Sequence, residues 1–303
     1  MAINVGTRAG NPPGFGNKML LLVLPALFIL MWSSGYVAGK LALPYAGPFT
    51  LIFIRFAVAA AVMLCVSVAF GAPWPKRASE YVHLAVVGLL VQAVQFSGLY
   101  FGLSHGISAG VSAVIVGMMP IFTALGAFVV LKESVNARQI VGLLIGLMGV
   151  AIVVSGKISF AGSDWVGYAA VAIALFGITS GTLYQKRYCP KLDLRSGVCV
   201  QLTTATFVAG LLAYFIEDFQ VQWTPELIGA SAWLSIVNSI GAVSVMFLLM
   251  RRGKASVVAS LFYLIPSVTA IMGYLVLGEK LTIIQIAGFI VSASGVYLTT
   301  RAK

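Results

Sequence analysis

Charged residues are scarce in this chain. They make up only 9% of its 303 residues, and hydrophobic residues make up 60%, whereas an ordinary soluble domain carries roughly 25% charged residues. A soluble core of this length could not keep so much apolar side chain from water, so the composition excludes an ordinary soluble protein. Lipid is the alternative solvent, and a helix of about 20 apolar residues crosses its hydrocarbon core.

Acidic residues are rarer still, and none falls deep inside an apolar stretch. All eight lie in predicted loops or at helix ends: Glu80, Glu133, Asp164, Asp193, Glu217, Asp218, Glu226 and Glu279. Paired carboxylates at membrane depth are therefore missing, as is a serine–histidine–aspartate set. We predict that the protein is not an enzyme and has no catalytic residues. A proton cycle carried by a buried carboxylate is disfavoured for the same reason.

Cysteine is also scarce, and its spacing indicates no metal site. The chain holds three cysteines, Cys65, Cys189 and Cys199, in no metal-binding pattern. We predict neither a metal nor a cofactor.

Long apolar runs dominate what remains. Ten stretches are long enough to cross a membrane, near residues 19–38, 49–70, 82–103, 108–131, 137–155, 165–186, 197–216, 228–249, 255–277 and 283–300. Residues 1–17 precede them, rich in Gly, Pro and Asn, and we predict a disordered tail there. The predicted fold class is an all-α integral membrane protein of ten transmembrane helices.

The net charge of +11 reflects how the chain is oriented in the membrane and does not indicate nucleic-acid binding. With the N-terminus in the cytoplasm and the chain alternating sides, 15 Lys and Arg residues fall inside and 3 outside. Short cytoplasmic loops carry such a basic excess, so we predict that both termini are cytoplasmic. The lipid bilayer is the expected partner, together with a small-molecule substrate and no nucleic acid.

The chain repeats itself at an offset of 146 residues. Ala109–Val154 aligns with Ala255–Thr300 without a gap, and 14 of the 46 positions are identical. We therefore divide the chain into halves 18–155 and 164–303, each of five helices. Since five is odd, the second half enters the membrane from the opposite side. Secondary transporters recurrently use such inverted repeats, with substrate bound near the midplane between the halves.

Buried polar residues mark the candidate substrate site. Gln92 lies nine residues into its span, close to mid-bilayer, and its repeat equivalent Asn238 lies at the same depth. Gln95 follows one turn after Gln92. Such amides either contact substrate or hydrogen-bond neighbouring helices. Further candidates for lining the site are Trp32, Tyr100, Met118, Phe176 and Tyr263, with His83 as the titratable group.

Two prolines and one arginine interrupt the apolar pattern. Pro120 and its repeat equivalent Pro266 each remove a backbone donor inside a span. We interpret them as hinges or cavity-shaping kinks, although each could simply bend its helix around neighbours. Arg55 is the one strong base well inside a span. It lies within snorkelling reach of the interface, and we favour a structural role over attraction of a carboxylate.

The two halves carry a family resemblance. The segments MMPIFTALGAFVVLKESV and YLIPSVTAIMGYLVLGEKLT resemble the drug/metabolite transporter superfamily, EamA type. The resemblance covers nearly the whole chain after residue 18. Arg55 in IFIRFAVAA matches an arginine common in the second span of such proteins. Within the superfamily the chain is most similar to bacterial amino acid and metabolite exporters of the YddG type.

The resemblance implies a basket-like bundle with a central cavity, braced at its periphery by the fifth and tenth helices. It also implies export across a bacterial inner membrane of neutral or aromatic amino acids and related metabolites. With no buried carboxylate, we expect alternating access by facilitated diffusion in a monomeric, multi-pass protein. A proton-coupled multidrug exporter is the alternative.

Overall fold

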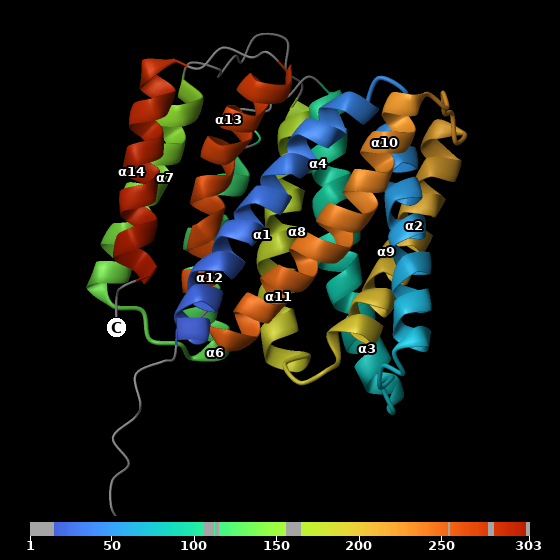
Figure 1. The fold of residues 1–303 in the computed structure, drawn as a ribbon, viewed down its shortest axis with the longest axis horizontal. Helices are drawn as coiled ribbons and strands as arrows, with labels where there is room; N and C mark the ends of the chain where they lie inside the picture. The colour runs from blue at the N-terminus through green and yellow to red at the C-terminus, as the bar shows by residue number, and fades with distance from the viewer. Residues whose placement is uncertain are drawn as a thin grey trace, which may run out of the picture.

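The structure, a computed structural model, describes residues 15–105, 112, 115–155, 165–253, 255–277 and 282–300. These residues form a bundle of helices (Figure 1), and an isolated bridge between Ala46 and Val221 is their only β pairing. The α-helices are α1 (Phe15–Ala42), α2 (Pro48–Ala69), α3 (Ala78–Val87), α4 (Gln95–Ser104), α6 (Met119–Leu131), α7 (Ala137–Ser155), α8 (Trp165–Tyr188), α9 (Leu194–Glu217), α10 (Pro225–Trp233), α11 (Val243–Arg252), α12 (Ala255–Ser260), α13 (Ile265–Leu277) and α14 (Ile283–Thr300). Two π-helices, η1 (Gly88–Val94) and η2 (Leu234–Ala242), and a 3₁₀ turn, η3 (Leu261–Leu264), join neighbouring α-helices.

The predicted all-helical, membrane-type fold is confirmed. Over its described residues, each of the ten predicted stretches coincides with a helix or with consecutive helical segments. Seven helices of the described part are long and apolar enough to cross a membrane, and the shorter apolar helices lie at 115–131, 137–152 and 286–299. The number of crossings and their directions stay predictions. Of the predicted tail, residues 1–14 lie outside the described residues, while 15–17 already belong to α1.

The helix boundaries repeat at the offset of 146. Helix α6 covers 119–131 and α13 covers 265–277, which is the same interval shifted by 146. The two π-helices begin at Gly88 and Leu234, again 146 apart. A π-helix is rare and is frequently found at functional sites. The sequence repeat is therefore matched by a repeat of local backbone structure.

Repeat-equivalent helices α2 and α9 pack side by side in opposite directions. At one end, Glu217 of α9 accepts the backbone N–H of Phe49 at 2.9 Å. At the other, Arg195 of α9 donates to the Phe70 carbonyl at 3.2 Å. The start of α2 thus meets the end of α9, and the reverse holds at the far end. Figure 1 shows this pair at one edge of the bundle.

The helices α7 and α14, at the other edge of the bundle, form a second antiparallel pair (Figure 1). A methyl group on Gly142 would lie 2.8 Å from the Thr299 nitrogen, and one on Gly149 would lie 2.7 Å from the Cα of Ser292. Glycine at both positions lets the two backbones approach closely, which is how membrane helices commonly associate. This pair occupies the peripheral place expected for the fifth and tenth helices.

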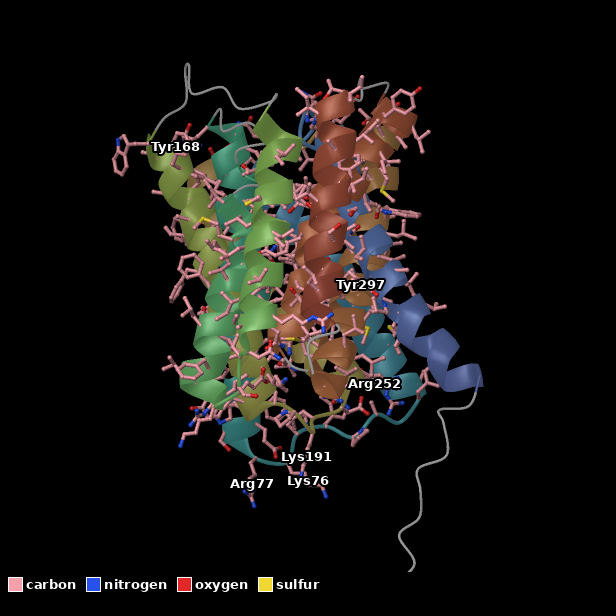
Figure 2. The ribbon with its side chains drawn as sticks, turned by 90° about the vertical axis from the view of Figure 1, so that its left-hand side faces the viewer. Lys76, Arg77, Tyr168, Lys191, Arg252 and Tyr297 are labelled. Carbon is pink, nitrogen blue, oxygen red and sulfur yellow. The ribbon has the colours of Figure 1, made fainter. Side chains whose placement is uncertain are left out.

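Basic side chains from separate connections gather at one end of the bundle. Figure 2 shows Lys76, Arg77, Lys191 and Arg252 there, and we call this end the basic end. Helix α1 runs away from it (Figure 1), so Lys40 in the last turn of α1 lies at the opposite end. Large apolar side chains such as Phe128, Phe207 and Ile290 are exposed along the sides. A lipid-facing surface is the environment in which such exposure is stable.

Candidate substrate site at the seam between the halves

Arg55 points into the bundle instead of toward the interface. It lies seven residues into α2, about 10 Å along the helix, and its side chain is only 1% exposed. Its Nε donates to the Oγ of Ser239 in η2 at 2.6 Å. The guanidinium carbon also lies 4.0 Å from the ring centroid of Phe96 in α4. The expectation of snorkelling is wrong, because the side chain finds polar and aromatic partners at depth.

Burial leaves the charge of Arg55 without an anionic partner among the described residues. The carboxylates that the structure describes lie in loops or at helix ends, and none of them is within 4.0 Å of the guanidinium. Moving an ion out of water carries a penalty of several kcal/mol. A desolvated cation–π contact returns about 2 kcal/mol or somewhat more. The local contacts therefore offset only part of the penalty.

Aromatic rings form one wall beside Arg55. The Phe96 ring lies 6.3 Å from that of Trp32 and 6.4 Å from that of Tyr100. Phe262 lies in η3, and its ring centroid is 5.1 Å from that of Trp32 in an edge-on arrangement. These rings come from α1, α4 and η3, so they bring together helices that are distant in sequence. Trp32 and Tyr100 thus lie together at the seam between the halves, and their contact with substrate stays a prediction.

The predicted amide pair lies in the two π-helices, Gln92 in η1 and Asn238 in η2. Asn238 is tied to α1, because its Nδ2 donates to the carbonyl of Met31 at 2.5 Å. Gln92 is 0% exposed, and neither its Oε1 nor its Nε2 has a hydrogen-bond partner among the described residues. The Oε1 atom of Gln95 is likewise buried without a partner. A buried polar group without a partner is costly and calls for an explanation, such as a bound water, ion or ligand.

Small residues on α1 make room for this cluster. A Cβ on Gly35 would collide with the amide of Asn238, and one on Gly39 would lie 2.7 Å from the Tyr100 hydroxyl. Glycine at these two positions lets α1 approach η2 and α4. We call Trp32, Arg55, Gln92, Phe96, Tyr100, Asn238 and Ser239 the seam cluster.

The other predicted site residues lie outside the seam cluster. Phe176 is 65% exposed on the outer face of α8. The Tyr263 ring packs against Gly146 of α7, and Met118 is half-buried against the main core. His83 lies near the basic end, where its Nδ1 is 2.8 Å from the Tyr184 hydroxyl.

Both predicted hinge prolines lie where a span is broken. Pro120 is the second residue of α6, directly after a turn at Met118. Pro266 is the second residue of α13, directly after the 3₁₀ turn η3. Proline fits the first turn of a helix, where its missing N–H would have no partner anyway. The Ser33 hydroxyl donates to the Ile265 carbonyl at 3.3 Å, which connects the second break to α1.

At the basic end an ion pair joins the two halves. The Nζ of Lys186 in α8 lies 2.7 Å from Oε1 of Glu133, which follows α6. The other carboxylate oxygen of Glu133 accepts the N–H of Ala255 at 3.2 Å, at the start of α12. We call Lys186 and Glu133 the clamp. Beside it lies a cavity of about 110 Å³ lined by Gln185, Lys186, Cys189, Pro190, Phe247, Met250 and Arg251.

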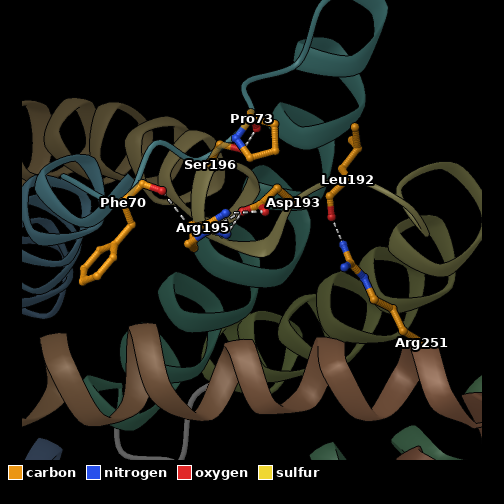
Figure 3. A network of polar contacts seen from close by, with 7 residues as sticks. All are labelled: Phe70, Pro73, Leu192, Asp193, Arg195, Ser196 and Arg251. Atoms are coloured by element: carbon orange, nitrogen blue, oxygen red, sulfur yellow. Dashed lines mark hydrogen bonds and ion pairs between the residues drawn. The ribbon is translucent and has the colours of Figure 1, made fainter. Parts of the chain in front are cut away.

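A second polar network closes the basic end around the start of α9 (Figure 3). Arg195 donates twice to the Asp193 carboxylate, each time at 3.0 Å. Ser196 donates to the Pro73 carbonyl at 2.7 Å, and Arg251 donates to the Leu192 carbonyl. The hydrogen bonds from Arg195 hold the pKa of Asp193 below its usual value. Burial raises the pKa of Cys189 to about 11.

Sequence reasoning left Arg55 outside the candidate site and overlooked Ser239. The signal for Arg55 was present, because a base inside an apolar stretch is a functional candidate by default. Ser239 directly follows Asn238, but serine is common in membrane helices, and only the fold reveals its contact with α2. No three His, Cys, Asp or Glu side chains of the described residues gather in a way that could hold a metal ion.

Comparisons with known proteins give consistent results. A model of the EamA-like transporter family matches residues 17–155 and 165–301. The chain is 29% identical over 294 residues to the uncharacterized transporter YvbV of Bacillus subtilis, covering 94% of this chain and 93% of that one. It is 29% identical over 296 residues to an uncharacterized transporter of Archaeoglobus fulgidus, covering 93% and 97%.

Two further matches concern location and fold. The chain is 26% identical over 292 residues to the uncharacterized inner membrane transporter YedA of Escherichia coli K12, covering 94% and 93%. A protein of known crystal structure superposes with a TM-score of 0.77 at 18% identity, covering 92% of this chain and 95% of the other. The last match shows a shared fold.

Proposed function

Since the chain belongs to the EamA-like transporter family, we propose that it exports small organic solutes by alternating access across a bacterial inner membrane. The proposed substrates are neutral and aromatic amino acids and related metabolites. The single observation that carries this proposal is the seam cluster, in which the Trp32 and Phe96 rings are buried together and the amide of Gln92, one turn before Phe96, has no hydrogen-bond partner among the described residues. Membership of the family indicates that the protein is a transporter, and the seam cluster is the proposed binding place for an amphipathic solute.

The backbone repeat supports an inverted arrangement of two halves. Equivalent helices α2 and α9 run antiparallel, and so do α7 and α14. Lys40 and its repeat equivalent Lys186 lie at opposite ends of the bundle. The family model matches the two proposed halves separately along the chain. Two similar halves can exchange conformations, which alternately exposes a site between them to either side.

The contacts between the halves suggest how access alternates. The clamp holds α8 to the segment after α6 at the basic end, which the charge bias places in the cytoplasm. The breaks before Pro120 and Pro266 give each half a place to bend. Opening toward the cytoplasm separates the clamp, and closing re-forms it.

Facilitated diffusion remains the proposed energetics. The alternative, a proton-coupled multidrug exporter, requires a titrating group in the transport path. His83 is the available candidate, but it lies with Tyr184 near the basic end, away from the seam cluster. Flux that is independent of a pH gradient favours facilitated diffusion, and flux that requires one favours the alternative.

Counterflow with purified protein in proteoliposomes tests the proposal. Vesicles are loaded in turn with each of the twenty amino acids, and exchange with the labelled amino acid is measured. Exchange of neutral or aromatic amino acids above protein-free vesicles is the expected result. Exchange with none of the twenty would contradict the proposed substrate class.

A further inference from the structure

We infer that Arg55 holds the carboxylate of the transported molecule, so that the chain selects small monocarboxylates with an apolar or aromatic body. This inference rests on the proposed transport function, and it names the chemistry that the seam cluster recognises. It replaces the purely structural role that the sequence suggested for Arg55. Three features of the structure support it: charge balance, guanidinium geometry and an asymmetry between the halves.

The charge balance at Arg55 is incomplete in the described residues. The guanidinium stays protonated under all ordinary conditions, and its side chain is almost completely buried. Its contacts are two hydroxyls, at Ser239 and Tyr100, and the aromatic rings of Phe96 and Phe56. Charged groups inside a membrane protein normally pair with an opposite charge or line a transport path. A ligand carboxylate would supply the opposite charge.

The ring contacts of Arg55 do not compete with a carboxylate for the same directions around the guanidinium. Phe96 covers a face of the guanidinium, with its centroid 4.0 Å from the central carbon. A carboxylate binds instead in the guanidinium plane, along the fork of N–H groups. The Nε edge is engaged by Ser239, and the Tyr100 hydroxyl lies beside the group. Ring contact and carboxylate binding therefore use different directions and can coexist, with the ligand body against the aromatic wall.

The halves differ at this position. The repeat equivalent of Arg55 is Gln201, a neutral residue whose Nε2 donates to Gln185 Oε1 at 3.1 Å. Only the first half thus carries a cation at this level, which suits one carboxylate per transport cycle. Arg55 would repel a cationic solute that has no carboxylate. The site therefore argues against the alternative in which the protein exports cationic drugs.

Gln92 offers the complementary contact for an amino group. It lies one turn before Phe96, and both atoms of its amide lack a partner. Either orientation of the amide therefore leaves an oxygen free to accept an N–H bond from a ligand ammonium. An amino acid would place its carboxylate at Arg55 and its ammonium near Gln92.

The test uses matched probes in counterflow with the full-length protein. L-Tryptophan is compared with L-tryptophanamide and tryptamine, which lack the carboxylate, and with indole-3-acetate, which lacks the amino group together with the carbon that carries it. The wild-type protein should exchange the carboxylate probes at least tenfold faster than tryptophanamide or tryptamine. Arg55→Gln should remove this preference by raising the KM for the carboxylate probes at least tenfold. Arg55→Lys keeps the charge without the fork and should give an intermediate preference.

Control variants separate recognition from folding. Gln201→Ala removes a buried amide at the equivalent position of the other half, so it should lower the melting temperature without changing the acid-to-amide ratio. If Arg55→Gln does not fold, the acid-to-amide ratio is measured in Arg55→Lys and in Ser239→Ala instead. Ser239→Ala is informative because it frees the Nε side of the Arg55 guanidinium. An unchanged ratio in every folded Arg55 and Ser239 variant would overturn the inference.

The outcomes distinguish this inference from the proposed function. Equal exchange of tryptophan and its amide by the wild type overturns the inference and leaves transport standing. Exchange of indole-3-acetate but of no amino acid, lost in Arg55→Gln, supports the inference and overturns the amino acid proposal. Exchange of no probe in any class overturns both.

Discussion

Lys186 and Glu133 form an ion pair, 2.7 Å between Nζ and Oε1, across the boundary between the two halves at the basic end. The side chains are largely shielded, at 21% and 14% exposure, and each has a further contact with a backbone group. In the alternating-access cycle proposed above, the elements that this pair holds together would have to separate. It is therefore a natural point at which to perturb the balance between conformations.

Breaking this clamp should open the cavity beside it. Glu133→Gln should increase the rate at which maleimide labels Cys189, which lines that cavity, by about 1.4- to fivefold. A partly exposed ion pair is worth about 0.2–1 kcal/mol, and 1.4 kcal/mol corresponds to a factor of ten. Labelling kinetics in a Cys65→Ser, Cys199→Ser background measure the effect. Glu80→Gln, which disturbs a helix start elsewhere at the basic end, should leave the rate unchanged.

Gly35→Ala should weaken both folding and transport. The added methyl group would collide with the Asn238 amide, so α1 and η2 must move apart, and overpacking of this kind costs about 1–3 kcal/mol. Thermal unfolding in detergent and counterflow measure the two effects. Gly229→Ala is the matched control, because a methyl group there would meet no atom within 4 Å. Equal stability of the two variants would contradict the close approach of α1 and η2.

The two amides should respond differently to replacement by leucine. The Gln92 side chain makes no hydrogen bond within the described protein, so Gln92→Leu should leave the melting temperature unchanged or raise it while reducing transport. Asn238 donates to the Met31 carbonyl, so Asn238→Leu should reduce stability by about 1–3 kcal/mol as well as transport. Full transport by folded Gln92→Leu would remove Gln92 from the site.

The two prolines should matter more for rate than for folding. Pro120→Ala and Pro266→Ala each restore a backbone donor at a break and favour a continuous helix. Transport per folded molecule should fall, whereas the yield of folded protein should change less. The double variant should be slower than either single one. Unchanged flux per folded molecule in all three variants would contradict a hinge role.

The network at Asp193 predicts a stability change in acid. Because hydrogen bonds from Arg195 lower the pKa of Asp193 in the folded state below its usual value, the charged carboxylate stabilises the folded protein when the pH lies above that usual value. This contribution disappears as the pH falls through the folded-state pKa. Melting temperatures of wild type and Asp193→Asn should therefore differ at pH 7 and converge in strong acid. A difference that persists unchanged at low pH would contradict this origin.

Some parts of the candidate site were predictable from sequence, and others were not. Gln92 and Asn238 stood out because an amide deep in an apolar stretch needs a reason, and the repeat relates the two. Phe176 and Tyr263 were grouped with them because apolar spans do not distinguish a residue facing a neighbouring helix from one facing lipid. Phe176 lies on the exposed side, and Tyr263 packs against α7. In a membrane both sides of a helix can be equally apolar, so hydropathy does not report which way a side chain points.

The sequence by itself determined the membrane environment, the helix positions and the internal repeat, because each depends on local composition or on comparison of the chain with itself. Only the tertiary structure decided what Arg55 contacts. Whether a long basic side chain reaches for the interface or turns inward depends on partners such as Ser239 and Phe96, which lie far along the chain. Those partners exist only after helices from both halves have packed together.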